Sequence, residues 1–288
     1  MLETVLANKP DQTTETTLNS ISPADAQSFN MNEKKAFKPV QQAHLVEIFS
    51  AIQGEGPIVG TRQIFVRFLG CHISCAYCDT PATHTKQRHC RVEQTPGRRD
   101  FIELANPVPI QDVIERINSL ESFKGLHDSI SLTGGEPLQH LRGLQTLIQT
   151  LKPDFRFYLE SDGILHQSLG QIIDSLDQIG MDIKIPSATG LQAYWQEHRA
   201  YLAIAARKEV FVKTVLTRDT TPEELATAIE IVAEVDRSIP LILQPVTPYG
   251  VVRHPPSPEQ MLQWQAQAKK ALKHVRVIPQ THKIMGQI

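Results

Sequence analysis

Three cysteines crowd together near the first quarter of the chain, at Cys71, Cys75 and Cys78. Three thiolates separated by four and three residues, in a loop directly after a predicted strand, can hold a four-iron, four-sulfur cubane and leave one iron open. That open iron can chelate the amino and carboxylate groups of S-adenosylmethionine. An electron passed from the cluster would then break a carbon–sulfur bond and yield a 5′-deoxyadenosyl radical. The spacing therefore predicts chemistry that the cofactors supply, while the protein orients them and excludes side reactions.

A structural zinc site is the alternative interpretation of these cysteines. Zinc normally takes four closed ligands, and the fourth would have to be His72 or the distant Cys90, neither of which has a typical spacing. Cys90 lies among Arg88, His89 and Arg91, which could lower the pKa of its thiol. We interpret it as an incidental loop cysteine, and the spacing favours the cluster over zinc.

The bulk composition describes a globular chain of 288 residues with a net charge of −2 and an apolar fraction of 41%. This length allows one large domain or two small ones. The nearly balanced charge gives no support for a nucleic-acid partner. No apolar run is long enough to span a bilayer, and the start of the chain lacks the pattern of a secretory signal. Clustered thiols suit a reducing compartment, so we expect no membrane partner and a cytoplasmic location.

The chain changes character near residue 44. Residues 1–43 are rich in Thr, Ser, Asn, Gln and Ala and show no sustained period, which predicts a disordered extension. A transit peptide is the alternative, but this stretch contains no Arg and carries several acids. We therefore expect a single catalytic domain over residues 44–288.

Strands and helices alternate through that domain. Apolar runs predict strands at 45–49, 63–69, 129–132, 155–159, 180–183, 210–215, 241–243 and 275–278. Helical periodicity and capping signals predict helices at 110–120, 141–151, 167–176 and 191–206, and two more after Thr221 and Ser257. The basic stretch 81–107 is expected to be irregular. This rhythm predicts an α/β fold, a full or partial (β/α) barrel of mostly parallel strands.

Unusual polar residues follow the predicted strands at equivalent places. In a parallel barrel the carboxyl ends of the strands form one mouth, where active sites are built. Any one of these sets could be a turn or a cap, but together they favour a functional site. Gly134 and Gly135 would let the backbone approach the methionine part of the cofactor, and Glu136 or a free backbone group could receive its ammonium. The sets are the three cysteines after Leu69, 133–137, 160–162, Asp182 with Lys184, 244–245 and 280–283.

At this point the chain resembles a known group of enzymes. The cysteine spacing with Gly134-Gly135-Glu136 is similar to the radical S-adenosylmethionine superfamily. Within it, four segments resemble the 7-carboxy-7-deazaguanine synthase family, and the resemblance spans residue 44 to the C-terminus. These segments are Phe49 through Gly56, Phe65-Val66-Arg67, Cys78-Asp79-Thr80 and Gln280-Thr281-His282-Lys283.

The resemblance implies a radical ring contraction in queuosine and deazapurine biosynthesis. The substrate would be 6-carboxy-5,6,7,8-tetrahydropterin, and the product 7-carboxy-7-deazaguanine, with loss of ammonia. The resemblance also implies a shortened barrel of the radical SAM type, a homodimer, Mg²⁺ beside the [4Fe-4S] cluster and S-adenosylmethionine, and a reductant such as flavodoxin or ferredoxin.

The resemblance also assigns site residues by position. Cys71, Cys75 and Cys78 would hold the cluster, and Thr80 would bind Mg²⁺. Cofactor contacts would come from Tyr77, Cys78, Asp79, Gly134, Gly135, Glu136, Ser161, Asp182, Ile183, Lys184, Gln244, Pro245, Val246 and Thr247. Substrate contacts would come from Ile52, Gln53, Gly54, Glu55, Arg67, Thr133, His282 and Ile288. Glu55 could accept hydrogen bonds from pterin N–H groups, and Arg67 could form a bidentate pair with a carboxylate.

The chain departs from the family pattern in five places. The family's Ser-Pro-Lys is Asp182-Ile183-Lys184 here, so the lysine is the secure match. The family's Glu-Thr-Asn-Gly is Glu160-Ser161-Asp162-Gly163, and the chain ends in Ile288 where some members contact substrate. The N-terminal extension and the basic loop 86–99 have no counterpart that we can assign.

Two other functions remain open from the sequence. A radical activase, which abstracts hydrogen from a glycine of a partner protein, shares the cysteine motif but needs no pterin pocket. A non-catalytic zinc-binding module is the alternative from a different class. Turnover of the carboxypterin with no partner present would separate the synthase from the activase, and iron or zinc content would test the module.

Overall fold

The computed structural model describes residues 42–287, within a compact unit that spans Pro39–Ile288. The predicted extension over residues 1–43 lies outside the described residues, except for Gln42 and Ala43, which form the short strand β1. Ile288 also lies outside them. No described helix is long and apolar enough to cross a membrane.

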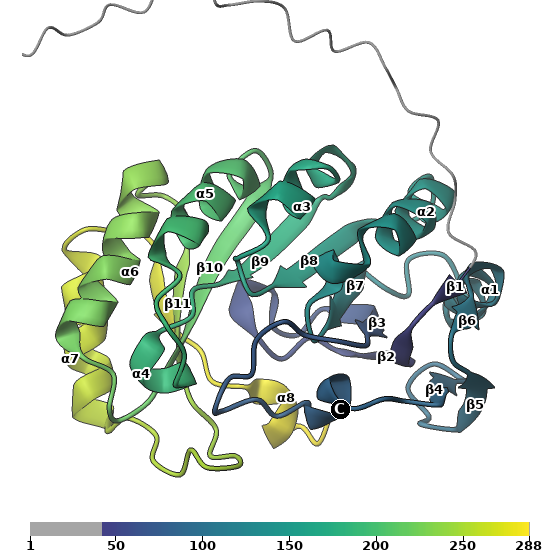
Figure 1. Cartoon of the computed structure of the whole chain (residues 1–288), viewed down its shortest axis with the longest axis horizontal. Helices are drawn as coiled ribbons and strands as arrows, with labels where there is room; N and C mark the ends of the chain where they lie inside the picture. Colours follow the sequence, from purple (N-terminus) through teal and green to yellow (C-terminus); the bar gives the residue numbers. More distant parts are fainter. Residues whose placement is uncertain (1–41, 288) are drawn as a thin grey trace, which may run out of the picture. The chain divides into compact units, whose positions relative to one another are not determined.

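A ten-stranded sheet forms the centre of the described chain, in the order β12-β11-β10-β9-β8-β7-β3-β2-β4-β5 (Figure 1). From β3 through β7 to β12 every pair of neighbours is parallel, whereas β2 runs antiparallel to β3. Among the described residues β5 and β12 are its two unpaired edges, so the barrel is partial, as predicted. The strands are β2 (Leu45–Ile52), β3 (Arg62–Phe68), β4 (His89–Glu93), β5 (Phe101–Ala105), β7 (Ser129–Gly134), β8 (Phe157–Ser161), β9 (Gln178–Asp182), β10 (Glu209–Leu216), β11 (Leu241–Pro245) and β12 (Val275–Val277). A separate pair joins β1 to β6 (Val108–Pro109).

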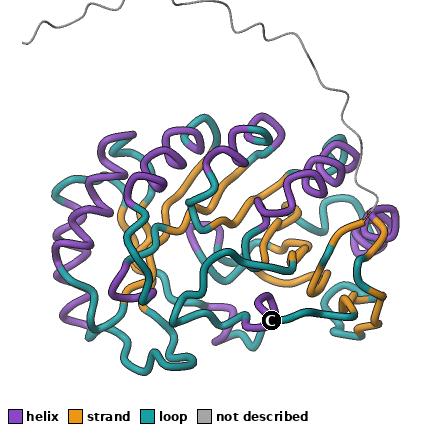
Figure 2. Tube along the Cα trace, viewed as in Figure 1, coloured by secondary structure: helices purple, strands orange, loops and turns teal. Residues whose placement is uncertain are grey.

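Helices connect the parallel strands, because a parallel pair needs a crossover. Figure 2 shows α2, α3, α5 and α6 as purple coils along one side of the sheet, while loops and the short α8 lie on the other. The helices are α1 (Ile110–Leu120), α2 (Leu141–Leu151), α3 (His166–Gly170), α4 (Pro186–Thr189), α5 (Trp195–Ala205), α6 (Pro222–Val235), α7 (Pro258–Lys269) and α8 (Thr281–Ile284). The predicted capping boxes at Thr221 and Ser257 are both present.

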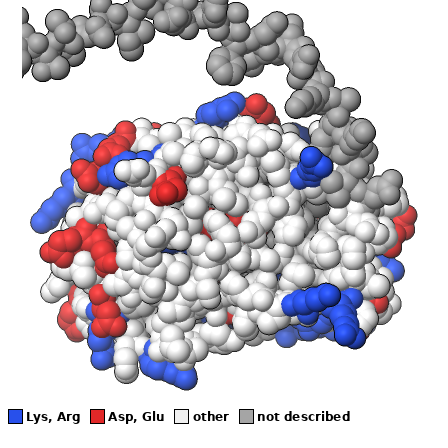
Figure 3. All heavy atoms as spheres, viewed as in Figure 1, with Lys and Arg blue, Asp and Glu red and all other residues white. Residues whose placement is uncertain are grey.

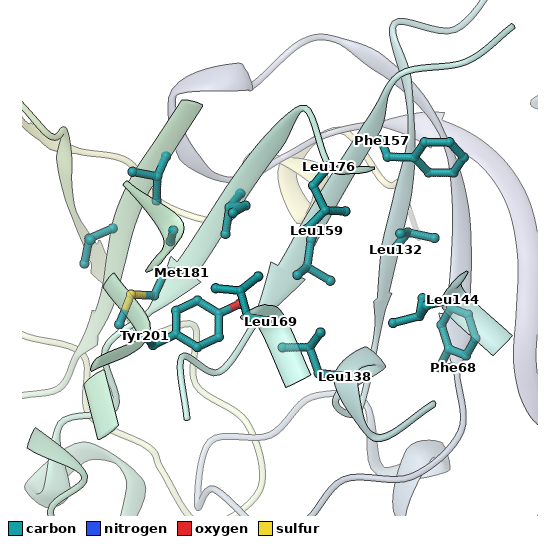
Figure 4. Packing of buried hydrophobic residues seen from close by; sticks show 14 of the residues in the cluster. Phe68, Leu132, Leu138, Leu144, Phe157, Leu159, Leu169, Leu176, Met181 and Tyr201 are labelled. Carbon is teal, nitrogen blue, oxygen red and sulfur yellow. The ribbon is translucent and has the colours of Figure 1, made fainter. Parts of the chain in front are cut away.

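The main core lies between these helices and the sheet. Leu144 of α2, Leu169 of α3 and Tyr201 of α5 are buried against strand residues such as Leu132 and Met181 (Figure 4). This layer fixes the positions at which the strands end. It is therefore the scaffold on which the loops at the carboxyl edge are held.

The sequence prediction was wrong for the stretch 81–107. It contains an antiparallel hairpin of β4 and β5, in which Cys90 lies opposite Leu104. Cys90 and Val92 are buried, while His89 and Arg91 are exposed. Because the outward positions of this strand carry basic residues, the alternation of apolar and polar residues is hard to recognise in the sequence. Cys90 is thus a core residue of a strand rather than a loop cysteine. Burial, assisted by the charge of Glu47, raises the pKa of its thiol to about 12, so the neighbouring arginines do not activate it.

Two predicted helices are shorter than expected. The segment 167–176 contains α3, which ends at Gly170, and then a 3₁₀ turn at Ile173–Ser175. The segment 191–206 becomes helical only at Trp195. Both helices nevertheless lie where the parallel crossovers require them.

Candidate active site

One cavity of about 900 Å³ lies at the carboxyl ends of the parallel strands. Loops after β3 and β7, the ends of β8, β9 and β11, and α8 all contribute to its wall. The predicted common mouth of the barrel is therefore present, and residues far apart in sequence meet there.

The three clustered cysteines all line this cavity, and none forms a disulfide. Backbone hydrogen bonds hold their loop, from Gly70 N to Thr83 O at 2.9 Å and from Ala76 N to Thr189 O at 2.8 Å. Burial raises the pKa of Cys71 to about 11 and also raises the pKa of Cys75. The thiols of Cys71 and Cys75 are therefore protonated at neutral pH, and binding of a metal must displace their protons.

The cysteine loop rests directly on the glycine pair after β7. A Cβ atom added to Gly135 would lie 2.0 Å from Gly70 O and 2.8 Å from Cys71 Cβ. Glu136 N donates to Gly70 O at 2.8 Å, which joins the two loops. Only glycine allows this close approach, so Gly135 sets the distance between the cysteines and the β7 end.

A buried cluster of charges forms the floor of the cavity. Lys213 of β10 donates to Glu55 and, at 3.1 Å, to Glu160, and its Nζ lies 3.9 Å from Asp182. Burial alone would lower the pKa of Lys213, but the three carboxylates raise it well above the usual value. Burial tends to raise the pKa of Glu55. The charge and the hydrogen bond of Lys213 oppose this effect and outweigh it, so that the pKa is lowered to about 2. Both groups are therefore ionised at neutral pH.

The segment around Gly54, near the start of the domain, meets the segment 280–282, near its end, beside Glu55. Gln280 Nε2 donates to Glu55 Oε1 at 2.7 Å, and Thr281 N donates to Gly54 O at 2.9 Å. A Cβ atom on Gly54 would lie 2.4 Å from His282 N, so the two segments are in direct contact. Burial lowers the pKa of His282, which leaves a neutral imidazole on the cavity wall.

Three buried oxygens of cavity-lining residues have no hydrogen-bond partner in the described part of the chain: the Tyr77 hydroxyl and two oxygens that can only accept. Asp182 Oδ1 and Gln244 Oε1 are both buried and unsatisfied, although Asp182 Oδ2 accepts from Lys184 Nζ at 2.8 Å. Buried acceptors normally find donors. These atoms therefore fit a ligand that brings hydroxyl or amino groups into the cavity.

The arrangement of side chains does not support the zinc alternative. Within residues 42–287, no three His, Cys, Asp or Glu side chains are arranged to hold one metal ion. A cubane differs, because each thiolate binds a different iron and the three need not converge on a point. The free thiols, the Gly135 contact and the unsatisfied acceptors together fit a cluster with an adjacent polar ligand.

Most of the predicted site residues line this one cavity. They are Ile52, Gln53, Gly54, Glu55, Arg67, Cys71, Cys75, Tyr77, Cys78, Asp79, Thr80, Thr133, Gly134, Gly135, Ser161, Asp182, Lys184, Gln244, Val246, Thr247 and His282.

Three predicted residues do not reach the cavity. Glu136 has no exposed surface, and its carboxylate accepts from Leu138 N, Ser161 Oγ and Asp162 N. It ties two loops together and is not free to receive an ammonium group. Ile183 belongs to the main core, and Pro245 lies outside the cavity lining. At both positions the side chain points away from the cavity, because successive side chains of a strand point to opposite faces of the sheet.

Sequence reasoning missed Lys213 and the pairing of His72 with Asp162, and it placed Glu160 in the polar set 160–162 without a role of its own. Lys213 stands in β10, where every residue from Val210 to Leu216 is buried, and a lysine inside such an apolar run is itself a signal. His72 Nε2 and Asp162 Oδ2 lie 2.6 Å apart and link the cysteine loop to the end of β8. That pair carries no sequence signal, because its members are far apart along the chain.

The fold and the cysteine loop define the class of protein, and comparison with known proteins agrees. The sequence model of the Radical SAM superfamily matches residues 65–235. The fold is similar to the crystal structure of QueE from Escherichia coli, with a TM-score of 0.53 and 20% identity over 84% of this chain and 95% of that chain. It is also similar to a radical SAM methyltransferase from Sphaerobacter thermophilus, with a TM-score of 0.53 and 12% identity over 81% and 77% of the two chains.

Sequence relatives narrow the class. The 7-carboxy-7-deazaguanine synthase of Geobacter sulfurreducens is 47% identical over 85% of this chain and 98% of its own length. The enzyme of the same name from Archaeoglobus fulgidus is 34% identical over 85% and 99%. The chain belongs to the 7-carboxy-7-deazaguanine synthase family of the radical SAM superfamily. Membership of the superfamily implies a [4Fe-4S] cluster and S-adenosylmethionine.

Proposed function

We propose that the protein is a 7-carboxy-7-deazaguanine synthase, which converts 6-carboxy-5,6,7,8-tetrahydropterin to 7-carboxy-7-deazaguanine with loss of ammonia. One observation carries the proposal: a single cavity is lined both by the three-cysteine loop and by a second polar group made of Gln53, Glu55, Arg67 and His282. The names of its relatives support the same activity.

The part of the cavity wall that contains the three cysteines suits the two cofactors, the cluster and S-adenosylmethionine. When bound, the cluster and S-adenosylmethionine supply the radical chemistry that removes a hydrogen atom from the substrate. Cys71, Cys75 and Cys78 would hold the cluster, and the close contact between Gly135 and Gly70 sets the position of their loop. Asp182 Oδ1 and Gln244 Oε1 would accept hydrogen bonds from ligand hydroxyl or amino groups, because both are buried and unsatisfied.

The second polar group suits a pterin with one carboxylate. Glu55 stays ionised because Lys213 and Gln280 stabilise its charge, so it can accept hydrogen bonds from the amino and ring N–H groups of the pterin. Arg67 is oriented by its Nε donating to Glu47 at 2.8 Å, which leaves its terminal nitrogens for the substrate carboxylate. Neutral His282 and the close contact at Gly54 would bound the ring on one side.

Further assignments rest on the family resemblance. We propose Thr80 as a ligand of Mg²⁺, since its hydroxyl lies in the cavity 3.7 Å from Cys78 Sγ and oxygen ligands suit this ion. We also propose a homodimer and an external reductant such as flavodoxin or ferredoxin. A cytoplasmic location stays a prediction from the clustered thiols.

Anaerobic iron–sulfur reconstitution followed by assay with the carboxypterin tests the proposal. We expect formation of 7-carboxy-7-deazaguanine and ammonia with no partner protein present. Cleavage of S-adenosylmethionine with no turnover of the carboxypterin would instead favour an activase. Protein that takes up zinc but no iron would contradict both enzymes.

A further inference from the structure

A row of polar side chains crosses five neighbouring strands at one wall of the cavity. Arg67 of β3 is the register partner of Thr133 on β7 and of Glu47 on β2, and Glu47 is in turn the partner of Arg91 on β4. Arg91 faces Glu103 on β5. All five residues line the cavity. Arg91 comes from the β4–β5 hairpin, which matched nothing in the family pattern.

Glu47 holds the two arginines of this row. Its Oε1 accepts from Arg67 Nε at 2.8 Å and its Oε2 accepts from Arg91 Nη2 at 2.6 Å. The carboxylate is only 5% exposed, whereas the side chains of Arg67 and Arg91 are 14% and 51% exposed. Within residues 42–287 Glu47 is the one hydrogen-bonded acceptor of each guanidinium, so their other N–H groups remain available at the cavity.

An aromatic ring lies beside each of the two guanidinium groups. Arg67 Cζ lies 5.8 Å from the ring centroid of Phe49, and Arg91 Cζ lies 4.8 Å from that of Phe101. Phe101 packs against the small buried cluster that contains Phe49. The two arginines are therefore preorganised, because each donates to Glu47 and makes a cation–π contact with a ring.

The two guanidinium groups share a single buried carboxylate, that of Glu47. The second carboxylate of the row, Glu103, is 66% exposed at the rim, where it lies 3.5 Å from His89. Figure 3 shows Lys and Arg side chains gathered over the region where Figure 1 places β4 and β5, which gives this part of the surface a positive potential.

We infer that Arg91 is a second carboxylate-binding arginine, which acts with Arg67 to bind the 6-carboxylate of the pterin substrate. Glu47 is a positioning residue that orients both guanidinium groups. This inference rests on the proposed function, because the carboxylate is that of the proposed substrate. It gives the β4–β5 hairpin a role in selecting pterins that carry a negative charge at this position.

The test compares Arg91→Gln with wild type in steady-state turnover and in direct binding of two stable oxidised pterins, 6-carboxypterin and 6-methylpterin. We expect KM for the substrate and Kd for 6-carboxypterin to rise ~10-fold, with kcat and Kd for 6-methylpterin unchanged. Arg98→Gln, on the exposed turn of the same hairpin and outside the cavity lining, is the matched control and should change neither.

Arg91→Lys is the second variant, in case Arg91→Gln disrupts the hairpin. It keeps a positive charge beside Glu47 and should therefore preserve the hairpin structure. We expect it to fold as wild type and still bind 6-carboxypterin more weakly, since an ammonium group lacks the planar fork. Unchanged KM and Kd in both variants, or equal losses for the two pterins, would overturn the inference. If the wild-type protein binds 6-carboxypterin but does not turn over the substrate, the proposed function is refuted. The comparison of Kd values between wild type and the Arg91 variants would still test the inference.

Discussion

Gly135 and Gly70 approach each other so closely that a single methyl group at Gly135 would lie 2.0 Å from the carbonyl oxygen of Gly70. The contact joins the end of β7 to the first residue before the cysteine loop, and a hydrogen bond from Glu136 N to the same oxygen at 2.8 Å reinforces it. The loop that carries Cys71 is thus positioned by backbone atoms, and no side chain at Gly135 can be accommodated without moving it.

Gly135→Ala should therefore destabilise the fold by about 1–3 kcal/mol, the usual cost of inserting a methyl group into a filled space. It should also reduce iron uptake, because the cysteine loop must shift. Gly143→Ala in α2 is the matched control: its Cβ would meet nothing within 4 Å, and the helix should gain about 0.5–1 kcal/mol. Urea unfolding and iron content check both. Equal stability of the two variants would contradict the structural role of Gly135.

The cluster assignment predicts different outcomes for substitution of Cys75 and of Cys90. Cys75→Ala should abolish iron–sulfur absorbance and cleavage of S-adenosylmethionine, because one of three ligands is lost. Cys90→Ala should keep both, since Cys90 lies in the core of β4 away from the cavity lining. Iron content and formation of 5′-deoxyadenosine after anaerobic reconstitution measure the difference. Retained cleavage in Cys75→Ala would refute the ligand assignment.

Lys213 should be essential for the stability of the cavity floor. Lys213→Met leaves Glu55 and Glu160 without their common cation, and an unpaired buried charge typically costs about 3–5 kcal/mol. The exposed Lys124→Met should change the free energy of unfolding by less than about 0.5 kcal/mol. Denaturant titration at pH 7 compares them. A loss no larger than that of the control would show that the two carboxylates do not depend on Lys213.

His198 should make stability depend on pH. Its Nε2 accepts from Lys184 N at 3.1 Å and its Nδ1 donates to Gly163 O at 3.0 Å, so the ring is neutral. Burial lowers its pKa to about 4, against about 6.5 in the unfolded chain. Below pH 6.5 the unfolded state binds a proton that the native state does not, so stability falls until about pH 4, by roughly 3 kcal/mol in total.

His198→Gln removes this linkage and should give a shallower decline of the free energy of unfolding between pH 7 and pH 4.5. The exposed His274→Gln should leave the wild-type slope in place. Urea unfolding at several pH values provides the comparison. Parallel curves for wild type and His198→Gln would mean that His198 is protonated in the folded protein.

The sequence alone was enough to predict the local features of this protein. The grouping of Cys71, Cys75 and Cys78, the caps at Thr221 and Ser257, and the alternation of strands and helices are short-range patterns. The structure confirms the caps and the alternation and brings the three cysteines to one cavity, while their role as cluster ligands stays a prediction. Because parallel strands end at one edge, the sequence also predicted which loops would meet. The hairpin of β4 and β5 escaped prediction, since its outward basic residues hid the buried positions.

Only the tertiary structure decided which charges meet and which predicted residues face the cavity. Lys213 and Glu55 are 158 residues apart and Glu47 and Arg91 are 44 apart, so no local pattern relates either pair. Glu136 and Ile183 looked equivalent to their neighbours in sequence, yet packing turns both away from the cavity. The reason is physical: spacing determines what a loop can bind, whereas the packing of strands and helices determines where each side chain points.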